Sequence, residues 1–342
     1  MDQQRPKLNM EIIIKDVLSV IEREREREII SRRFGLFDRR ETLEQIGEML
    51  GITRERVRQL EKAILAKLKI SADEDLPHIY EVERAIVGSV KALGKVARVS
   101  DIAPMICGTS TKVDEARIYF LARLCNSLSI IEDSDYYYPS IGLKAVHDEA
   151  TIKKHVNRIV DTIKKIGKPT NIDEIQRAIG HDSAEHVRAL ALVSREVATL
   201  NGRWGLTKWP MVNPRNIRDK IYVALHDTGR QMHFSQIADA IEHSGYRKKQ
   251  VTLQAIHNEL IKDNRFVLVG RGIYALREWG YNAGTVSDVI VEILRKEGKP
   301  MHRDEIVRRV LKVRFVKETT ILLNLQGKPE FKRVAKATYA LA

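Results

Sequence analysis

Residues 42–53 read TLEQIGEMLGIT, and this stretch decides the fold of the N-terminal part of the chain. Thr42 followed three residues later by Gln45 is a capping box, which begins a helix. The apolar side chains of that helix recur at spacings of three and four, on Leu43, Ile46 and Leu50. Gly51 suits the left-handed residue of a tight turn, and Thr53 is the N-cap of a second helix. The pattern predicts a helix-turn-helix, whose second helix lies in the major groove of DNA.

The second helix presents a polar face opposite its buried side, which carries Val57, Leu60 and Ile64. Arg side chains can bond guanine, Gln can bond adenine and Glu can accept from the amino group of cytosine. The predicted base-reading residues on the polar face are Arg54, Glu55, Arg58 and Gln59. The predicted phosphate contacts are Thr42, Thr53, Arg56, Arg58 and Lys62. An ordinary charged helix surface without a partner is the alternative that composition alone leaves open.

The segment that precedes these helices, residues 11–34, is predicted to form one helix that ends at Gly35. Within it, residues 22–28 alternate Glu and Arg, so that i,i+3 neighbours attract each other and i,i+4 neighbours repel. We therefore expect a solvated helix face of modest stability in this run, and not a binding tract.

Four segments together resemble region 4 of the primary sigma factors. They are EREII at 26–30, RFGL at 33–36, TLEQIG at 42–47 and TRERVRQLE at 53–61. In that family this region binds the −35 promoter element and the flap of the RNA polymerase β subunit. The resemblance therefore implies promoter DNA and core polymerase as partners. By position it implies base contacts from Arg54, Glu55 and Gln59, and backbone contacts mainly from Arg56 and Arg58.

The resemblance covers about residues 12–69, and no segment resembles sigma region 2, the aromatic-rich part that melts the −10 element. Two roles are therefore open for a sigma-like protein of this kind. It acts either as a partial sigma factor, with a separate protein supplying region 2, or as an accessory transcription factor.

The rest of the chain repeats a pattern four times. Each repeat contains an amphipathic helix that ends at an anchor glycine, two further helices and a short β-prone end, and the anchors are Gly94, Gly167, Gly229 and Gly298. This order predicts winged helices. The expected fold is mainly α with small β-hairpin wings, in domains at 1–70, 79–146, 150–209, 214–281 and 284–342, with linkers near 71–78 and 208–214. The last two domains resemble the HARE-HTH family, which includes the N-terminal domain of the RNA polymerase delta subunit, and the first two look more divergent.

The formal net charge of +13 points to a polyanionic partner. Residues 1–70 carry +3, residues 71–148 carry −4 and residues 149–342 carry +14. Among the winged helices, the third is the best candidate for DNA contacts, through Arg247, Lys248, Lys249 and Arg271. A protein-docking or spacer array is the alternative, and the acidic first repeat favours it locally because phosphates would repel that repeat.

Other protein classes lack their sequence signals. The apolar runs are too short for a membrane helix, no signal peptide begins the sequence, and two cysteines exclude a disulfide framework. A cytoplasmic, nucleoid-associated protein is expected. No P-loop or metal motif occurs, and histidines such as His233, His243, His257 and His302 lie in the repeated helices, so we expect no enzyme, cofactor or metal. Two rivals to a sigma-like role stay open: a DNA-binding repressor or nucleoid-type regulator that never touches polymerase, and a winged-helix scaffold in a defence or restriction setting.

Overall fold

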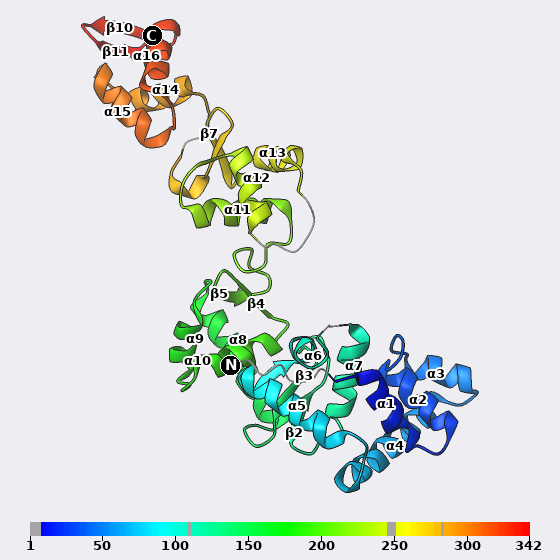
Figure 1. The fold of residues 1–342 in the computed structure, drawn as a ribbon. Coiled ribbons are helices and arrows are strands. Elements are labelled where there is room, and N and C mark those ends of the chain that lie inside the picture. Colours follow the sequence, from blue (N-terminus) through cyan, green and yellow to red (C-terminus); the bar gives the residue numbers. More distant parts are fainter. Residues whose placement is uncertain (1–7, 109–110, 245–250, 282–283) are drawn as a thin grey trace. The chain divides into compact units, whose positions relative to one another are not determined.

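The computed structural model describes residues 8–108, 111–244, 251–281 and 284–342 (Figure 1). It confirms a mainly helical protein with small antiparallel sheets. The chain divides into two compact units, Met1–Lys208 and Trp209–Ala342. The division falls at the start of the second expected linker, 208–214.

Four helices form the N-terminal part: α1 (Met10–Ser19), α2 (Glu24–Phe34), α3 (Leu43–Leu50) and α4 (Arg54–Glu74). The prediction of one helix over 11–34 was wrong, because the helix breaks between α1 and α2. Ile21 is buried at the break, and its carbonyl oxygen accepts a hydrogen bond from Arg27 Nη1 at 3.1 Å. The break lets α1 pack on α7 while α2 packs mainly on α4 and also contacts α7.

The stretch 71–78 is not an extended linker. Its first four residues form the last turn of α4, and Leu76 is buried. Ile64 and Leu68 of α4 share one hydrophobic core with Val82 and Ile86 of the next helix. Burial of these apolar side chains joins the helix-turn-helix to the element that follows it.

The first winged module, residues 79–143, contains α5 (Ile79–Ala92), β1 (Val96–Arg98), α6 (Val99–Cys107), α7 (Lys112–Ala122), β2 (Leu128–Ile131) and β3 (Ser140–Leu143). Its antiparallel sheet has the strand order β1-β3-β2. Helix, strand, two helices and a hairpin, with the return strand in the middle of the sheet, is the topology of a winged helix.

The second winged module, residues 149–206, contains α8 (Glu149–Ile166), α9 (Ile172–Ile179), α10 (Ala184–Val193), β4 (Val197–Leu200) and β5 (Arg203–Leu206). The position of its first strand is reduced to one bridge between Thr170 and Trp204. Helix α10 packs on β1 of the first module. Nδ1 of His186 in α10 lies 2.6 Å from the carbonyl oxygen of Gly94.

The second unit holds two further modules of the same topology. The third, residues 217–276, contains α11 (Ile217–Thr228), β6 (Met232–His233), α12 (Phe234–His243), α13 (Leu253–Lys262), β7 (Phe266–Gly270) and β8 (Ile273–Leu276), and a 3-10 turn, η1 (Arg277–Trp279), follows it. The fourth, residues 286–341, contains α14 (Val286–Glu297), β9 (Met301–His302), α15 (Arg303–Val313), α16 (Glu318–Gly327), β10 (Phe331–Ala335) and β11 (Thr338–Leu341). Their sheets have the orders β6-β8-β7 and β10-β11-β9.

Strand β7 is an edge strand of the third module, and the fourth module covers it. The backbone N–H of Phe315 donates to the carbonyl oxygen of Val269 at 3.2 Å, and the guanidinium of Arg314 donates to that of Leu268. These bonds use backbone groups that an open sheet edge would leave unpaired. The third and fourth modules therefore form one unit through this edge.

The anchor glycine Gly94 is placed where no side chain fits. Its φ is +94°, and an added Cβ would lie 2.9 Å from Ala189 Cβ and 3.0 Å from the Glu185 carbonyl oxygen. Gly167 also has a positive φ, of +72°, but an added Cβ would meet nothing within 4 Å. The two glycines thus separate the effect of backbone conformation from that of close packing between modules.

We expect Gly94→Ala to lower the free energy of unfolding of the first unit by about 2–4 kcal/mol, since backbone strain and overpacking add. Gly167→Ala should cost only about 1 kcal/mol, from backbone strain alone. The measurement is urea unfolding of the full chain followed by fluorescence of buried Trp204, with Trp209 and Trp279 replaced by Phe. Equal losses in the two variants would contradict close packing at Gly94.

Candidate nucleic-acid interface

The helix-turn-helix begins and turns where the sequence predicted. Thr42 Oγ1 accepts from the backbone N–H of Gln45 at 3.3 Å, and Gln45 Oε1 accepts from that of Thr42 at 2.9 Å, which completes the capping box. Gly51 has a φ of +64° at the turn. Thr53 Oγ1 accepts from the backbone N–H of Arg56 at 3.2 Å. Both threonine hydroxyls use an acceptor lone pair in these caps, so each O–H is free to donate to a phosphate.

A small core fixes the angle between α3 and α4. Ile29, Ile46 and Val57 are fully buried against one another. Gly47 lets α3 lie close to the turn that leads into α4, because an added Cβ would lie 2.7 Å from the Ile52 carbonyl oxygen. Arg25 of α2 donates to the last carbonyl of α3, on Leu50, at 2.6 Å. The small core, the close packing at Gly47 and the hydrogen bond from Arg25 together fix the turn and the direction in which α4 leaves it.

The predicted DNA-reading residues lie together on α4. Their side chains are all exposed: Arg54, Glu55, Arg56, Arg58, Gln59 and Lys62. Glu55 lies at the centre of the group, since its two carboxylate oxygens accept from Arg58 Nε at 2.8 Å and from Arg58 Nη2 at 2.6 Å. Gln59 Nε2 lies 3.5 Å from the same carboxylate.

Two more pairs complete the face. Arg54 forms an ion pair of 2.9 Å with Glu44 of α3, and Arg56 Nη1 donates to Gln59 Oε1 at 3.3 Å. Exposed pairs of this kind contribute little to stability, so a partner can exchange them at small cost. Hydrogen bonds from Arg58 hold the pKa of the Glu55 carboxyl below its ordinary value, so this group stays an ionised acceptor.

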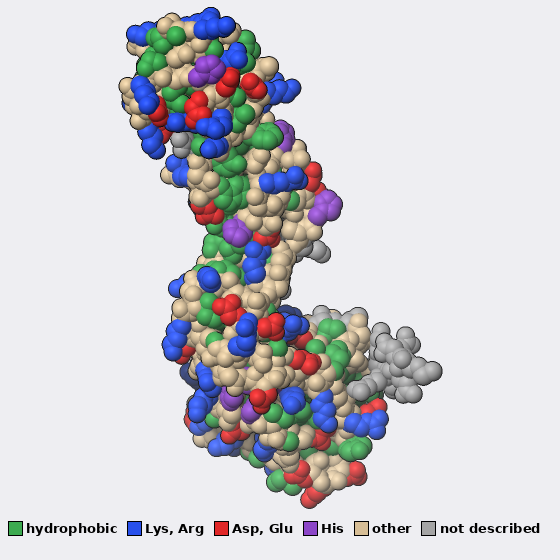
Figure 2. Space-filling model, turned by 90° about the vertical axis from the view of Figure 1, so that its left-hand side faces the viewer, with side chains coloured by type: hydrophobic (Ala, Val, Ile, Leu, Met, Phe, Trp, Pro, Cys, Tyr) green, Lys and Arg blue, Asp and Glu red, His purple; other side chains and the backbone are tan. Residues whose placement is uncertain are grey.

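Of the wing and third-helix residues that the sequence predicted in the second unit, one lies in the described part of the chain. Arg271 lies exposed in the turn between β7 and β8, while Arg247, Lys248 and Lys249 fall outside the described residues. Arg265, beside the hairpin, is bound to Asp219 and Asp263. In the fourth module, Lys and Arg side chains are spread among acidic ones on the face that Figure 2 shows. Sequence reasoning therefore left only Arg271 as an exposed wing candidate in the described part of this unit.

A histidine cluster in the first unit was missed by sequence reasoning. His147 after β3, His155 on α8, His181 after α9 and His186 on α10 have neighbouring ring centroids 4.9–6.3 Å apart. No spacing in the sequence links them, because the fold brings them together from separate elements. Within the described residues no group of His, Cys, Asp and Glu side chains could hold a metal ion.

Residues 23–69 match a known family described as Sigma-70, region 4. "RNA polymerase sigma factor sigB" of Arabidopsis thaliana is 54% identical over 46 residues, which are 13% of this chain and 8% of that protein. "RNA polymerase sigma factor SigA" of a Bacillus species is 47% identical over 57 residues, 16% of this chain and 15% of that protein. The helix-turn-helix therefore belongs to a DNA-binding, sigma-like region. It is a sigma-70 region 4 domain, and the chain spans only a small part of the length of these relatives.

In the described residues, no helix is both long and apolar enough to cross a membrane.

The histidine cluster predicts that the stability of the first unit depends on pH. Burial lowers the pKa of His147, His155 and His186, and neighbouring imidazoles lower it further. The unfolded chain therefore binds protons first as the pH falls below about 6.5, so stability is full above that pH and is lost as the pH falls. We expect faster amide hydrogen exchange in peptides of α8 and α10 at pH 5.5 than at pH 7.5, after correction for intrinsic rates.

His186→Gln should weaken this pH dependence, and His243→Gln, outside the cluster, should leave it unchanged. Exchange that is equally protected at both pH values in the unsubstituted chain would show that the cluster carries no such linkage.

Proposed function

We propose that this chain is a sigma-like transcription protein, in which α4 recognises a −35-type promoter element and the region 4 domain docks on core RNA polymerase at the β flap. The observation that carries the proposal is the exposed face of α4, where the base-reading candidates Arg54, Glu55, Arg58 and Gln59 project from the first two turns of a helix held rigidly by its turn. The match of residues 23–69 to sigma region 4 supports it.

Binding exchanges contacts within this face for contacts to DNA. In the free chain Arg58 and Gln59 bond to Glu55, and Arg54 bonds to Glu44. In the groove, Arg and Gln donors turn to base edges and Glu55 accepts from an amino group. Phosphate contacts fix the register without reading the sequence, from Thr42, Thr53, Arg56, Arg58 and Lys62.

The functions that region 4 lacks would come from a separate protein and from the winged modules. We propose that a separate protein provides the promoter-melting function of sigma region 2, and that the winged modules add DNA or protein contacts. The likeness of residues 214–281 and 284–342 to the HARE-HTH family is part of this proposal, as are a nucleoid location and the lack of a catalytic role.

A pull-down of purified core polymerase with the full chain, followed by footprinting on genomic fragments, tests the proposal. We expect polymerase-dependent protection of a shared −35-like motif. Gln59→Ala and Arg58→Ala should each weaken it roughly 5- to 150-fold, since one good base contact is worth about 1–3 kcal/mol. Lys67→Ala, an exposed basic residue further along α4, is the matched control and should change protection little.

Retention of polymerase by both variants would place their defect in DNA reading. DNA protection by the unsubstituted chain without any polymerase binding would refute the sigma-like role and leave a polymerase-independent DNA-binding regulator.

A further inference from the structure

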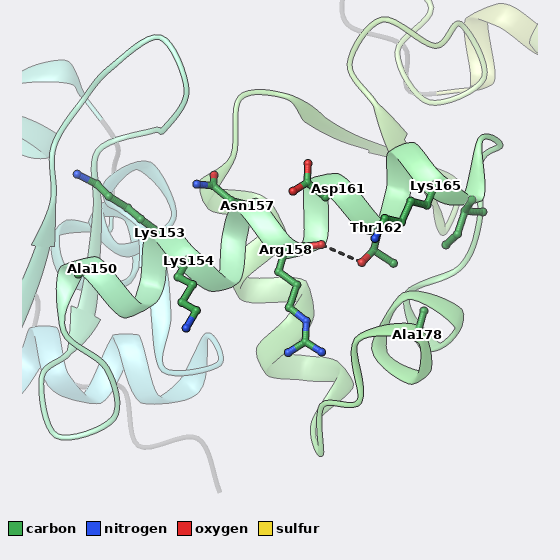
Figure 3. A pocket seen from close by; sticks show the side chains of 10 residues that line it. Ala150, Lys153, Lys154, Asn157, Arg158, Asp161, Thr162, Lys165 and Ala178 are labelled. Atoms are coloured by element: carbon green, nitrogen blue, oxygen red, sulfur yellow. Dashed lines mark hydrogen bonds between the residues drawn. The ribbon is translucent and has the colours of Figure 1, made fainter.

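A groove of about 1030 Å³ follows the exposed side of α8 and reaches α9 (Figure 3). Seven of its ten lining residues are polar or charged, four of them basic, and the lining consists of Ala150, Lys153, Lys154, Asn157, Arg158, Asp161, Thr162, Lys165, Ile166 and Ala178. In Figure 3 the side chains of Lys154 and Arg158 extend toward the same edge of the groove. The sequence analysis predicted no binding site at these residues.

Three cations of the groove have no partner of their own. Lys154, Arg158 and Lys165 are exposed, and their side chains form no ion pair or hydrogen bond within the described part of the chain. Lys153 is paired with Glu149 at 2.6 Å. The one acid of the lining, Asp161, lies 4.0 Å from Lys164 Nζ, but Lys164 is paired more closely with Glu196, at 3.1 Å, so Asp161 keeps most of its charge.

The three free cations form a row. They stand at positions i, i+4 and i+11 of α8, within about 40° of one another around the helix and over about 16 Å along it. Double-stranded DNA carries one negative charge per roughly 1.7 Å of its axis, so several phosphates fall within that length. Ala150 and Ala178 at the edges of the groove are small and leave room for a close approach of a bulky backbone.

The usual reading surface of this module is already occupied. A winged helix that binds DNA places its third helix in the groove, but α10, the third helix here, packs on β1. His186, Ala189 and Leu190 of α10 are buried. A DNA contact by the second module therefore has to use another face, and α8 offers the free cations.

We propose that the groove along α8 binds the sugar–phosphate backbone of double-stranded DNA without reading its sequence. The proposal rests on the proposed function in one respect, the choice of DNA as the polyanion. An acidic protein fits the groove less well, because Ile166, itself half-buried, is the only large apolar side chain among its described lining residues.

The test uses the full chain and a 30-base-pair duplex that lacks any −35-like motif, with fluorescence anisotropy between about 50 and 200 mM salt. The triple variant Lys154→Ala, Arg158→Ala, Lys165→Ala should reduce the slope of log K against log salt by up to about 2.7, at roughly 0.9 per phosphate contact. A control variant removes the same charge outside the groove, through the exposed residues Lys91, Lys144 and Lys208. That control should retain most of the slope.

A gain-of-binding variant separates this effect from misfolding. Asp161→Asn removes the one negative charge of the groove, so it should tighten binding to the same duplex several-fold. Equal slopes for the triple variant and the control, or no gain in Asp161→Asn, would overturn the proposal. So would a triple variant that loses an acidic protein partner while its DNA slope is unchanged.

The two proposals fail separately. Loss of slope in the triple variant without a −35 footprint in any experiment would sustain the α8 groove and refute the sigma-like role. A normal −35 footprint with an unchanged slope in the triple variant would do the reverse.

Discussion

One continuous hydrophobic core joins the helix-turn-helix to the winged module after it, and residues 8–143 depend on this core. Side chains from α1, α2 and α4 share this core with α5, α6 and α7. Phe34 of α2 and Phe120 of α7 lie with ring centroids 5.1 Å apart, and buried Arg117 donates to the Leu36 carbonyl oxygen at 2.8 Å. Because the buried guanidinium is also paired with Asp114, its charge is compensated. Helix α4, the proposed DNA-reading helix, is therefore packed into a larger body and does not belong to a domain on a flexible linker.

This rigidity has a consequence for recognition. An α4 held by core packing keeps its exposed face in one arrangement, so binding need not order the helix itself, and less of the contact energy is spent on ordering. The side chains of the face are different, because they are exposed and bonded to one another through Glu55 and Glu44. In the proposed function, the side chains of this face would thus change rotamer and partner on DNA, without a change of fold.

The local signals of the helix-turn-helix were sufficient to predict it. The capping box at Thr42, the turn at Gly51 and the N-cap at Thr53 are interactions between residues a few positions apart, so the sequence displays them directly. The break near Ile21, the burial of Leu76 and the histidine cluster were missed, because each depends on contacts between distant segments. The polar face of α4 shows the same difference between local and distant signals. Helical periodicity was enough to predict its exposure, but the pairing of Arg54 with Glu44 could be predicted only with the angle between α3 and α4. The α8 groove depends on both kinds of signal. The spacing of its cations can be read from the sequence, but the packing of α10 on β1 cannot.

Packing between modules determines which surfaces remain for partners. In the second module the third helix, α10, packs on β1 of the first module. In the third module the edge of β7 accepts hydrogen bonds from Phe315 and Arg314 of the fourth module. In each case a surface that an isolated winged helix could offer to DNA or to a protein stabilises the array instead. A chain assembled in this way contacts a long partner through the faces left over, and in the described part of the first unit the exposed polar sides of α4 and α8 are two of them. In the proposed function α4 supplies side chains that discriminate bases, and in the proposal for the α8 groove that helix supplies unpaired cations. DNA-binding proteins divide specific reading and general attraction in this way.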